Sequence, residues 1–462
     1  MLKDILAEVV NAAVNNFGAE YVELRAQKIF KTMLTIKEER VEAAKEGVEN
    51  GTAIRVLVNG AWGFASSCSL DTKTLVSVAS EVCKMAKVAS QKLKNPIKLV
   101  ESKAFEDRVS AKPKKDPSKV SIEDKIRTTS TIAETVLGYD RRVKSCTVDY
   151  LDLVGTSYFS NNEGAYIEQD KLYVWARILV TAKEGEVFTF SREEVGSTSG
   201  YDVFDVEVPE VVGERAAKRA IEQLKARTPK GGTVPVVLGP NVVGVFVHEA
   251  FGHLAEADLT LSGSVLMGKL GKKVASEVIT IYDDGTIEGA FGSFKYDDEG
   301  IPAQKTLLVE DGVVVGLMHN RETSRKFNAK PTGNARAEDF RVEPIIRMRN
   351  TFLAPKDHSF EELIEGIKFG YYFKSFRGGQ ANLDGTFQVG IQEGYEIVKG
   401  EIGEPVRNAS ISGNTLETLH KVDAVGKDFE LWPGRCGKGQ TAFVCDGGPH
   451  IRVKGVLVGG GA

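Results

Sequence analysis

The chain has 462 residues, a length that suits two or three domains with full hydrophobic cores. Apolar residues make up 42% and charged residues 27%, which excludes a largely disordered chain. Lysine and arginine total 60 against 64 acidic residues, so the formal charge of -4 favours neither nucleic acid nor an anionic membrane as a partner. The five cysteines make no disulfide framework, and we see no signal peptide or membrane span. We therefore expect a cytoplasmic protein.

The first half of the chain mixes helical and strand patterns. Apolar residues recur at helical spacing from Leu2 to Phe17, and Gly18 is expected to end this helix. Further helices are predicted at 75–86, 121–138 and 208–226. Short strands are predicted at 21–25, 32–36, 55–58 and 61–65, with Asn59-Gly60 as a hairpin turn between the last two. Residues 101–120 are charged and predict a solvated loop, and 143–194 predict an antiparallel meander.

The second half begins after a segment rich in glycine and proline, residues 228–232, which we interpret as a linker. A strand at 233–238 and an apolar helix from about Val242 follow, and then many short strands separated by turns, with one clear helix at 360–369. The sequence thus predicts an α+β fold of two domains, 1–227 and 228–462. Both are expected to be mainly antiparallel sheet with helices packed on the sheet faces.

The pattern that points to chemistry is His248-Glu249-Ala250-Phe251-Gly252-His253. It is one residue longer than the H-E-x-x-H helix of metalloproteases, in which two imidazoles bind zinc and the glutamate activates water. Residues i and i+5 lie about 140° apart on a regular helix and cannot face one metal ion. A π-bulge takes up one extra residue and restores a common face. We therefore predict an irregular helix between Glu249 and His253, made less costly by Gly252.

A catalytic zinc site usually has three protein ligands. Cys436 ranks first as the third ligand, because it lies in the glycine-rich turn 434–440 between two cations that favour a thiolate. His450 ranks second, and Glu256 or Asp258 third. Cys445 follows a strand-like apolar run and is expected to lie in the core.

Several motifs in the same order make the chain similar to the TldD/PmbA family, in its TldD branch. They include the segments 18–25, 55–67, 331–336 (PTGNAR), 347–351 (RMRNT) and 458–460, together with the histidine motif and Cys436-Gly437-Lys438. This resemblance implies a cytoplasmic, zinc-dependent peptidase that acts on short or unfolded peptides. It implies that His248, His253 and Cys436 bind Zn²⁺ and that Glu249 is the general base. It also implies a dimer, formed with an identical chain or with a PmbA-like chain.

On this hypothesis Glu249 takes a proton from a zinc-bound water and passes it to the leaving amine. Glu256 and Asp258 are candidates for orienting an imidazole. Arg336, Arg377 and either Tyr371 or Tyr372 are candidates for lining a substrate channel. Whether His450 or Cys445 contributes to the metal site is left open.

Two other functions compete with the zinc peptidase. A cysteine hydrolase would use Cys436 as its nucleophile and would be insensitive to chelators, but it leaves the His-Glu pattern unexplained. A non-catalytic peptide-binding or regulatory subunit would bind peptides without cleaving them.

Overall fold

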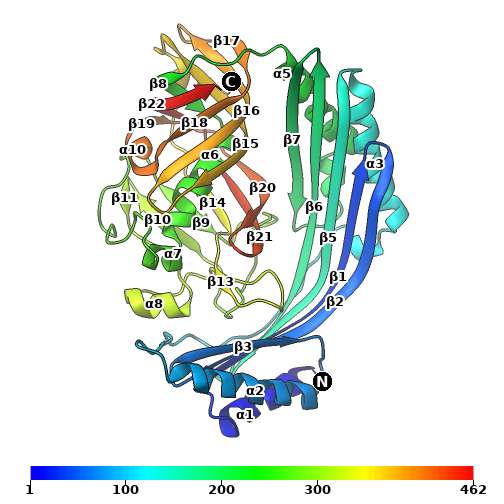
Figure 1. The fold of residues 1–462 in the computed structure, drawn as a ribbon, viewed down its shortest axis with the longest axis vertical. Coiled ribbons are helices and arrows are strands. Elements are labelled where there is room, and N and C mark those ends of the chain that lie inside the picture. The colour runs from blue at the N-terminus through cyan, green and yellow to red at the C-terminus, as the bar shows by residue number, and fades with distance from the viewer. Residues whose placement is uncertain (1, 461–462) are drawn as a thin grey trace.

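The computed structural model describes residues 2–460 and has the expected α+β fold, built mainly on antiparallel sheets (Figure 1). In the first half the helices are α1 (Leu2–Asn15), α2 (Thr72–Ser90), α3 (Ile122–Tyr139), α4 (Val203–Val206) and α5 (Pro209–Leu224). The strands are β1 (Tyr21–Lys37), β2 (Arg40–Val58), β3 (Ala61–Ser67), β4 (Glu106–Val109), β5 (Val143–Asn161), β6 (Tyr166–Glu184) and β7 (Val187–Ser197).

These seven strands form one strongly curved sheet in the order β3-β2-β1-β5-β6-β4, with β7 also paired to β6. Helices α1 and α2 bury their apolar stripes against one end of the sheet, and α3 and α5 pack against the other end. Figure 1 shows the long strands bending around the second half of the chain, which lies on their concave side.

The second half contains a short closed barrel and a separate open sheet. Strands β15, β8, β22, β18 and β16 pair in that order, and β15 also pairs with β16, which closes the ring. The open sheet has the order β11-β10-β9-β14-β21-β20. Helix α6 packs against β15 of the barrel and against β14 and β21 of the sheet, so it lies between the two layers.

The barrel strands, with β17 and β19 attached to them, are β8 (Gly232–Leu238), β15 (Phe369–Ala381), β16 (Thr386–Val398), β17 (Glu401–Val406), β18 (Ala409–Asn414), β19 (Val422–Val425) and β22 (Ile451–Gly460). The remaining strands are β9 (Ile281–Asp284), β10 (Lys305–Glu310), β11 (Val313–Val314), β12 (Ala335–Arg336), β13 (Ile345–Ile346), β14 (Asn350–Leu353), β20 (Glu430–Gly437) and β21 (Thr441–Gly448). The helices are α6 (Pro240–Val247), α7 (Ala257–Leu261), α8 (Arg321–Phe327), α9 (Phe360–Ile364) and α10 (Thr415–His420).

Several sequence predictions give the right element with the wrong extent. Segments 21–25 and 32–36 belong to the single strand β1, and 55–58 is only the end of β2. Most of residues 40–51 are exposed, so they carry no apolar alternation, and pairing with β1 alone extends the strand through them. The predicted loop 101–120 contains β4, which pairs in parallel with β6. The predicted helix 360–369 ends at Ile364, because Phe369 already begins β15.

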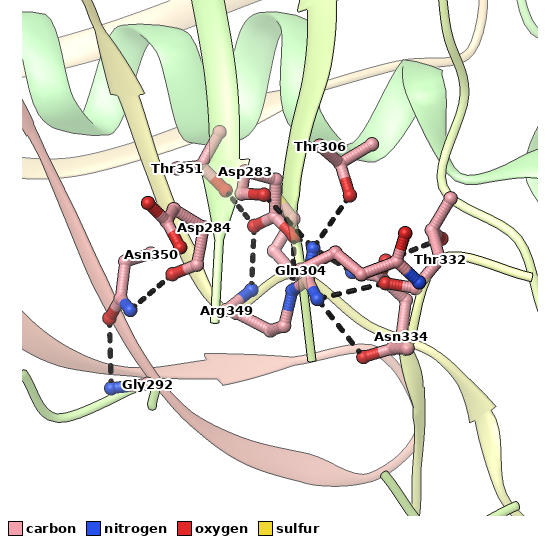
Figure 2. Close-up of polar contacts among 12 residues, drawn as sticks. Asp283, Asp284, Gly292, Gln304, Thr306, Thr332, Asn334, Arg349, Asn350 and Thr351 are labelled. Carbon is pink, nitrogen blue, oxygen red and sulfur yellow. Dashed lines mark hydrogen bonds and ion pairs between the residues drawn. The ribbon is translucent and has the colours of Figure 1, made fainter. Parts of the chain in front are cut away.

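Asp283 and Arg349 form a buried polar cluster within the open sheet (Figure 2). Arg349 Nε donates to Asp283 Oδ2 over 2.7 Å, and both side chains are 0% exposed. The same carboxylate accepts hydrogen bonds from the side chains of Asn334 and Thr351 and from the backbone N–H of Arg349. This cluster fixes β9 to β14 and holds the segment 347–349, which supports the candidate metal centre.

Candidate metal centre

The helix that carries the histidine motif is irregular at the predicted place. Helix α6 continues into a π-helical turn over His248–Gly252, followed by a 3-10 turn over His253–Ala255. The extra residue of the π-helical turn brings the two imidazoles to one side, with ring centroids 5.2 Å apart and ring planes at 87°. The predicted π-distortion is confirmed.

Two glycines allow this helix to lie close to its neighbours. A Cβ added at Gly244 would lie 2.6 Å from the backbone nitrogen of Gly447 on β21, so only glycine fits there. A Cβ at Gly252 would lie 2.1 Å from Met348 Sδ. The backbone of Gly252 is helical, with φ of -55°, so the residue serves close packing rather than an unusual conformation. This corrects the sequence-based explanation of Gly252.

Cys436 meets the two histidines from the opposite side, out of the edge strand β20. Its Sγ lies 3.3 Å from His253 Nε2, and one donor atom from each of His248, His253 and Cys436 lies within 4.8 Å of the others. Cys436 lies in the last part of β20. The sequence had indicated a turn at this position. Arg347 holds this strand end, because its guanidinium donates to the carbonyl oxygens of Cys436 and Gln440.

Opposite charges stabilise one another within this cluster. Burial raises the pKa of the Cys436 thiol, but the two histidines outweigh it and lower the pKa to about 4. Burial lowers the pKa of both imidazoles. Contact with Cys436 outweighs burial at His248 and raises its pKa to about 9. Cys436 and Glu256 together raise the pKa of His253 to about 10. The histidines therefore stabilise the thiolate, a role that the sequence had suggested for the flanking cations Arg435 and Lys438.

Of the two carboxylates that were proposed to orient an imidazole, Glu256 is the one that contacts His253. Its Oε2 lies 2.8 Å from His253 Nδ1, so it accepts that proton and leaves Nε2 free to face Cys436. Glu256 is 0% exposed and also lies 3.2 Å from Lys438 Nζ. Asp258 binds the same lysine at 2.7 Å and does not contact an imidazole. The role of Lys438 in bridging both carboxylates was missed, because nothing in the sequence places it beside them.

Glu249 lies at the wall of a cavity of about 430 Å³ that also reaches His248 and Cys436. Its Oε2 is 3.9 Å from His253 Nε2, and its side chain is 26% exposed. It is therefore the carboxylate of the motif that solvent and a ligand can reach.

The alternative ligands do not join this cluster. His450 donates and accepts elsewhere, since its Nδ1 lies 2.7 Å from Asp428 and its Nε2 lies 3.0 Å from the Tyr372 hydroxyl. Cys445 is buried in the core, and its Sγ accepts a hydrogen bond from the backbone N–H of Phe291. Burial raises the pKa of the Cys445 thiol to about 12.

The candidate channel residues are dispersed. Tyr372 lines the same cavity as Glu249, whereas Tyr371 is 0% exposed and its hydroxyl contacts the backbone of Lys230. Arg377 is exposed on β15, and Arg336 lines a different cavity.

The donors present fit a zinc ion. Two imidazoles and a thiolate are ligands that zinc prefers, and magnesium and calcium prefer oxygen. His248 Nδ1 is buried and has no hydrogen-bond partner among residues 2–460. A buried polar atom normally has a partner, so this one fits a site that binds a further group.

A closed barrel lies beside a curved sheet, and two histidines from an irregular helix meet Cys436 from the edge strand β20. This arrangement defines a metallopeptidase-like centre, and comparison with known proteins gives the family. Three profiles described as PmbA/TldA metallopeptidase domain 1, central domain and C-terminal domain match residues 22–86, 115–224 and 231–460. A protein named metalloprotease from Methanothermobacter thermautotrophicus is 41% identical, with 96% of each chain covered. A zinc metalloprotease TldD homolog from Saccharolobus solfataricus is 38% identical, covering 96% of this chain and 97% of that one. The chain belongs to the TldD/PmbA metallopeptidase family.

Solved structures show the same fold at low sequence identity. TldE from Thermococcus kodakarensis aligns with a TM-score of 0.78 and 21% identity, over 99% of this chain and 100% of that one. A protein from Thermotoga maritima aligns with a TM-score of 0.81 and 23% identity, over 99% of this chain and 100% of that one. Among residues 2–460, no helix has the length and apolar character needed to cross a membrane.

Proposed function

We propose that this chain is a zinc peptidase in which His248, His253 and Cys436 bind Zn²⁺ and Glu249 is the general base. The observation that carries the proposal is the convergence of the three donor atoms within 4.8 Å, beside a carboxylate that opens to a cavity. Zinc held by three protein ligands would act as a Lewis acid and would lower the pKa of a bound water towards neutral pH. The name of the Saccharolobus relative supports the choice of zinc.

The side chains around the metal have separate tasks in this mechanism. Glu249 accepts the proton of the attacking water and delivers it to the leaving amine, because it is the accessible carboxylate beside His253. Glu256 Oε2 accepts the Nδ1 proton of His253, so that Nε2 is the ring nitrogen that faces Cys436. Lys438 holds Glu256 in place, since its Nζ lies 3.2 Å from Glu256 Oε2.

The shape of the cavity supports an extended peptide as substrate. One face of the β20–β21 hairpin forms its floor, with Trp432, Gly434 and Cys436 on one strand and Val444 and Asp446 on the other. From Cys436 back to Glu430 the strand spans about 20 Å, since each residue of a strand rises about 3.3 Å. A floor of this length suits a short or unfolded peptide, whereas a folded protein cannot lay a single extended chain along it.

The test measures zinc content and peptide cleavage on the same preparations. We expect about one zinc per chain in the wild type, by stoichiometry of a three-ligand site, and cleavage of an unfolded peptide that a chelator abolishes. Glu249→Gln should retain the zinc and lose activity by roughly 10²–10⁴-fold, the usual contribution of a general base.

Three results would each contradict the proposal in a different way. A wild type without zinc after reconstitution would favour the non-catalytic peptide-binding or regulatory subunit. Cleavage that survives chelation would favour the cysteine hydrolase. Full activity of Glu249→Gln would remove the general base from this position.

We also propose that the chain acts as a cytoplasmic dimer, with an identical or a PmbA-like partner, and without nucleic acid or membrane as a partner. The proposal rests on the family resemblance, and the net charge of -4 supports the absence of nucleic acid. Light scattering of the purified chain, alone and mixed with a PmbA-like chain, distinguishes the two dimers. A monomer in both experiments would contradict the proposal.

A further inference from the structure

A second cavity of about 250 Å³ lies on the other face of the β20–β21 hairpin. Leu151, Leu153 and Tyr173 from the concave side of the curved sheet form one wall. Phe294 and Phe443 from the second half form the opposite wall. Arg435 borders this cavity and also the cavity that holds the metal centre, so the two meet at the edge of β20.

Arg336 brings unused hydrogen-bond donors to this cavity. Its side chain is 8% exposed, and its one hydrogen bond runs from Nη1 to the carbonyl oxygen of Met348. The guanidinium also lies over the ring of Phe294, 5.2 Å from the centroid. A guanidinium carries five N–H groups, so most donors of this buried cation remain free. Arg336 has no ion-pair partner in the described part of the chain, and a buried charge without one is costly.

Arg435 supplies a second guanidinium to the same cavity. It is held over the rings of Trp175 and Phe443, at 5.1 and 6.0 Å from their centroids. Within residues 2–460 its side chain has neither a hydrogen bond nor an ion pair with a carboxylate. Stacking on aromatic rings fixes the plane of a guanidinium while its edge stays available for an anion.

The carboxylates of the cavity wall are already bound. Asp298 lies 3.8 Å from Lys171 and accepts from the backbone N–H of Ala337. Asp297 accepts from three backbone N–H groups, those of Glu299, Ile301 and Ala335.

The wall has four more carboxylates of this kind, of which Asp339 is paired with Arg341 at 2.6 Å. Glu49 lies 3.8 Å from Lys31, Glu338 accepts from the backbone N–H of Thr441, and Asp170 from that of Ala111. The third arginine of the wall, Arg347, is also committed, since it donates to the backbone around Cys436. The wall thus combines two guanidiniums that have free donors with carboxylates that already have partners.

We propose that this cavity is a carboxylate-binding subsite, in which Arg336 and Arg435 bind a carboxylate of a peptide next to the metal centre. Two guanidiniums match the planar, two-oxygen geometry of a carboxylate. The cavity volume suits a single amino-acid-sized group rather than a large ligand. The carboxylate comes either from the C-terminus of the peptide or from an aspartate or glutamate side chain. The inference rests on the proposed function in taking a peptide as the ligand.

The test uses the zinc-loaded Glu249→Gln protein, so that bound peptides are not consumed, and calorimetric titration with three probes. These are N-acetyl-tetraalanine with a free C-terminus, the same peptide as its C-terminal amide, and an amidated peptide with one internal glutamate. We expect at least one of the two carboxylate probes to bind about tenfold more tightly than the neutral amide, the gain typical of charge-assisted hydrogen bonds. The probe that gains identifies the source of the carboxylate.

Arg435→Gln should remove most of this selectivity while binding of the neutral amide stays unchanged. Arg435 is exposed, so this variant should fold normally, and Arg336→Gln should act in the same direction. Arg177→Gln is the matched control, because Arg177 also lies over Trp175, at 5.6 Å, but is paired with Asp149. A carboxylate bound by zinc itself would keep its advantage in the arginine variants.

Equal affinity for all three probes, no binding of any probe, or selectivity that survives both arginine variants would overturn the proposal. Failure of the proposed function appears elsewhere, as a wild type without zinc or without cleavage. Selective binding can persist in such a protein, so the two failures are distinguishable.

Discussion

Two buried polar clusters in the second half of the chain differ in how completely their donors and acceptors are paired. In the Asp283–Arg349 cluster both charges are paired, and the carboxylate oxygens accept further hydrogen bonds from Asn334 and Thr351 (Figure 2). In the His248–His253–Cys436 cluster three metal-binding donors converge, and one imidazole nitrogen has no partner among residues 2–460. A satisfied buried cluster stabilises a fold, whereas an incomplete one indicates a ligand. The predictions below test this difference.

Replacing the thiolate should have the largest effect. Cys436→Ser removes the softest of the three donors, and we expect zinc content to fall from about one per chain to a small fraction and peptidase activity to disappear. Elemental mass spectrometry and a cleavage assay measure both. Cys445→Ala is the control, since this buried cysteine accepts a hydrogen bond from the backbone of Phe291 and lies outside the three-donor cluster, so the variant should keep its zinc. Zinc retained in Cys436→Ser would show that the third ligand lies elsewhere.

Breaking the satisfied cluster should damage stability and leave zinc stoichiometry unchanged. Asp283→Asn leaves the Arg349 charge buried and unpaired, which should cost about 3–5 kcal/mol of the free energy of unfolding. Urea denaturation measures the loss. The exposed pair Glu81–Lys84 is the control, because Glu81→Gln should change stability by less than about 0.5 kcal/mol. A small effect of Asp283→Asn would mean that the cluster adds little to the fold.

Removing the carboxylate that orients His253 should weaken the metal site without abolishing it. Glu256→Gln replaces the acceptor at 2.8 Å from Nδ1, and zinc affinity should fall by roughly 10–100-fold, as is typical for such partners. Competition with a chelator of known affinity measures this change. Asp258→Asn is the matched control, because Asp258 binds Lys438 and no imidazole. Equal losses in both variants would assign the effect to Lys438 instead.

The smallest expected effect concerns His319, a buried histidine without a charged partner among residues 2–460. Burial lowers its pKa from 6.5 to about 4, whereas the pKa values of His248 and His253 are raised. A pKa lowered by folding stabilises the protein above pH 6.5, and this contribution is lost as the pH falls towards 4. Between pH 7 and 5 the wild type should lose about 2 kcal/mol more of its free energy of unfolding than His319→Gln. Parallel pH profiles would contradict this interpretation.

The site could be predicted from sequence where a local pattern carried the information. The His-Glu spacing, together with helix geometry, was sufficient to predict the π-helical turn at His248–Gly252. Glu256 and Asp258 were both candidates for orienting an imidazole because they follow His253 closely, and the structure shows that Glu256 makes this contact. The partners of His450 could not be predicted, because Tyr372 comes from β15 and Asp428 from the segment between β19 and β20.

The fold class and the type of the main elements were similarly predictable, and the extents of the elements were not. Apolar periodicity located buried parts of β1 and β2, and the exposed part of β2 is a strand only because it pairs with β1. Pairing with a distant strand also made β4 out of a charged segment that the sequence predicted as a loop.

The sequence by itself determined the α+β class, the irregular helix of the histidine motif and the family, since these depend on periodicity, spacing and ordered motifs. The tertiary structure alone decided that Cys436 meets His253 from an edge strand, and that Lys438 joins Glu256 to Asp258. It also decided that Arg336 and Arg435 share one cavity. The physical reason is that contacts between distant segments depend on strand pairing and packing across layers, which leave no local trace in the chain.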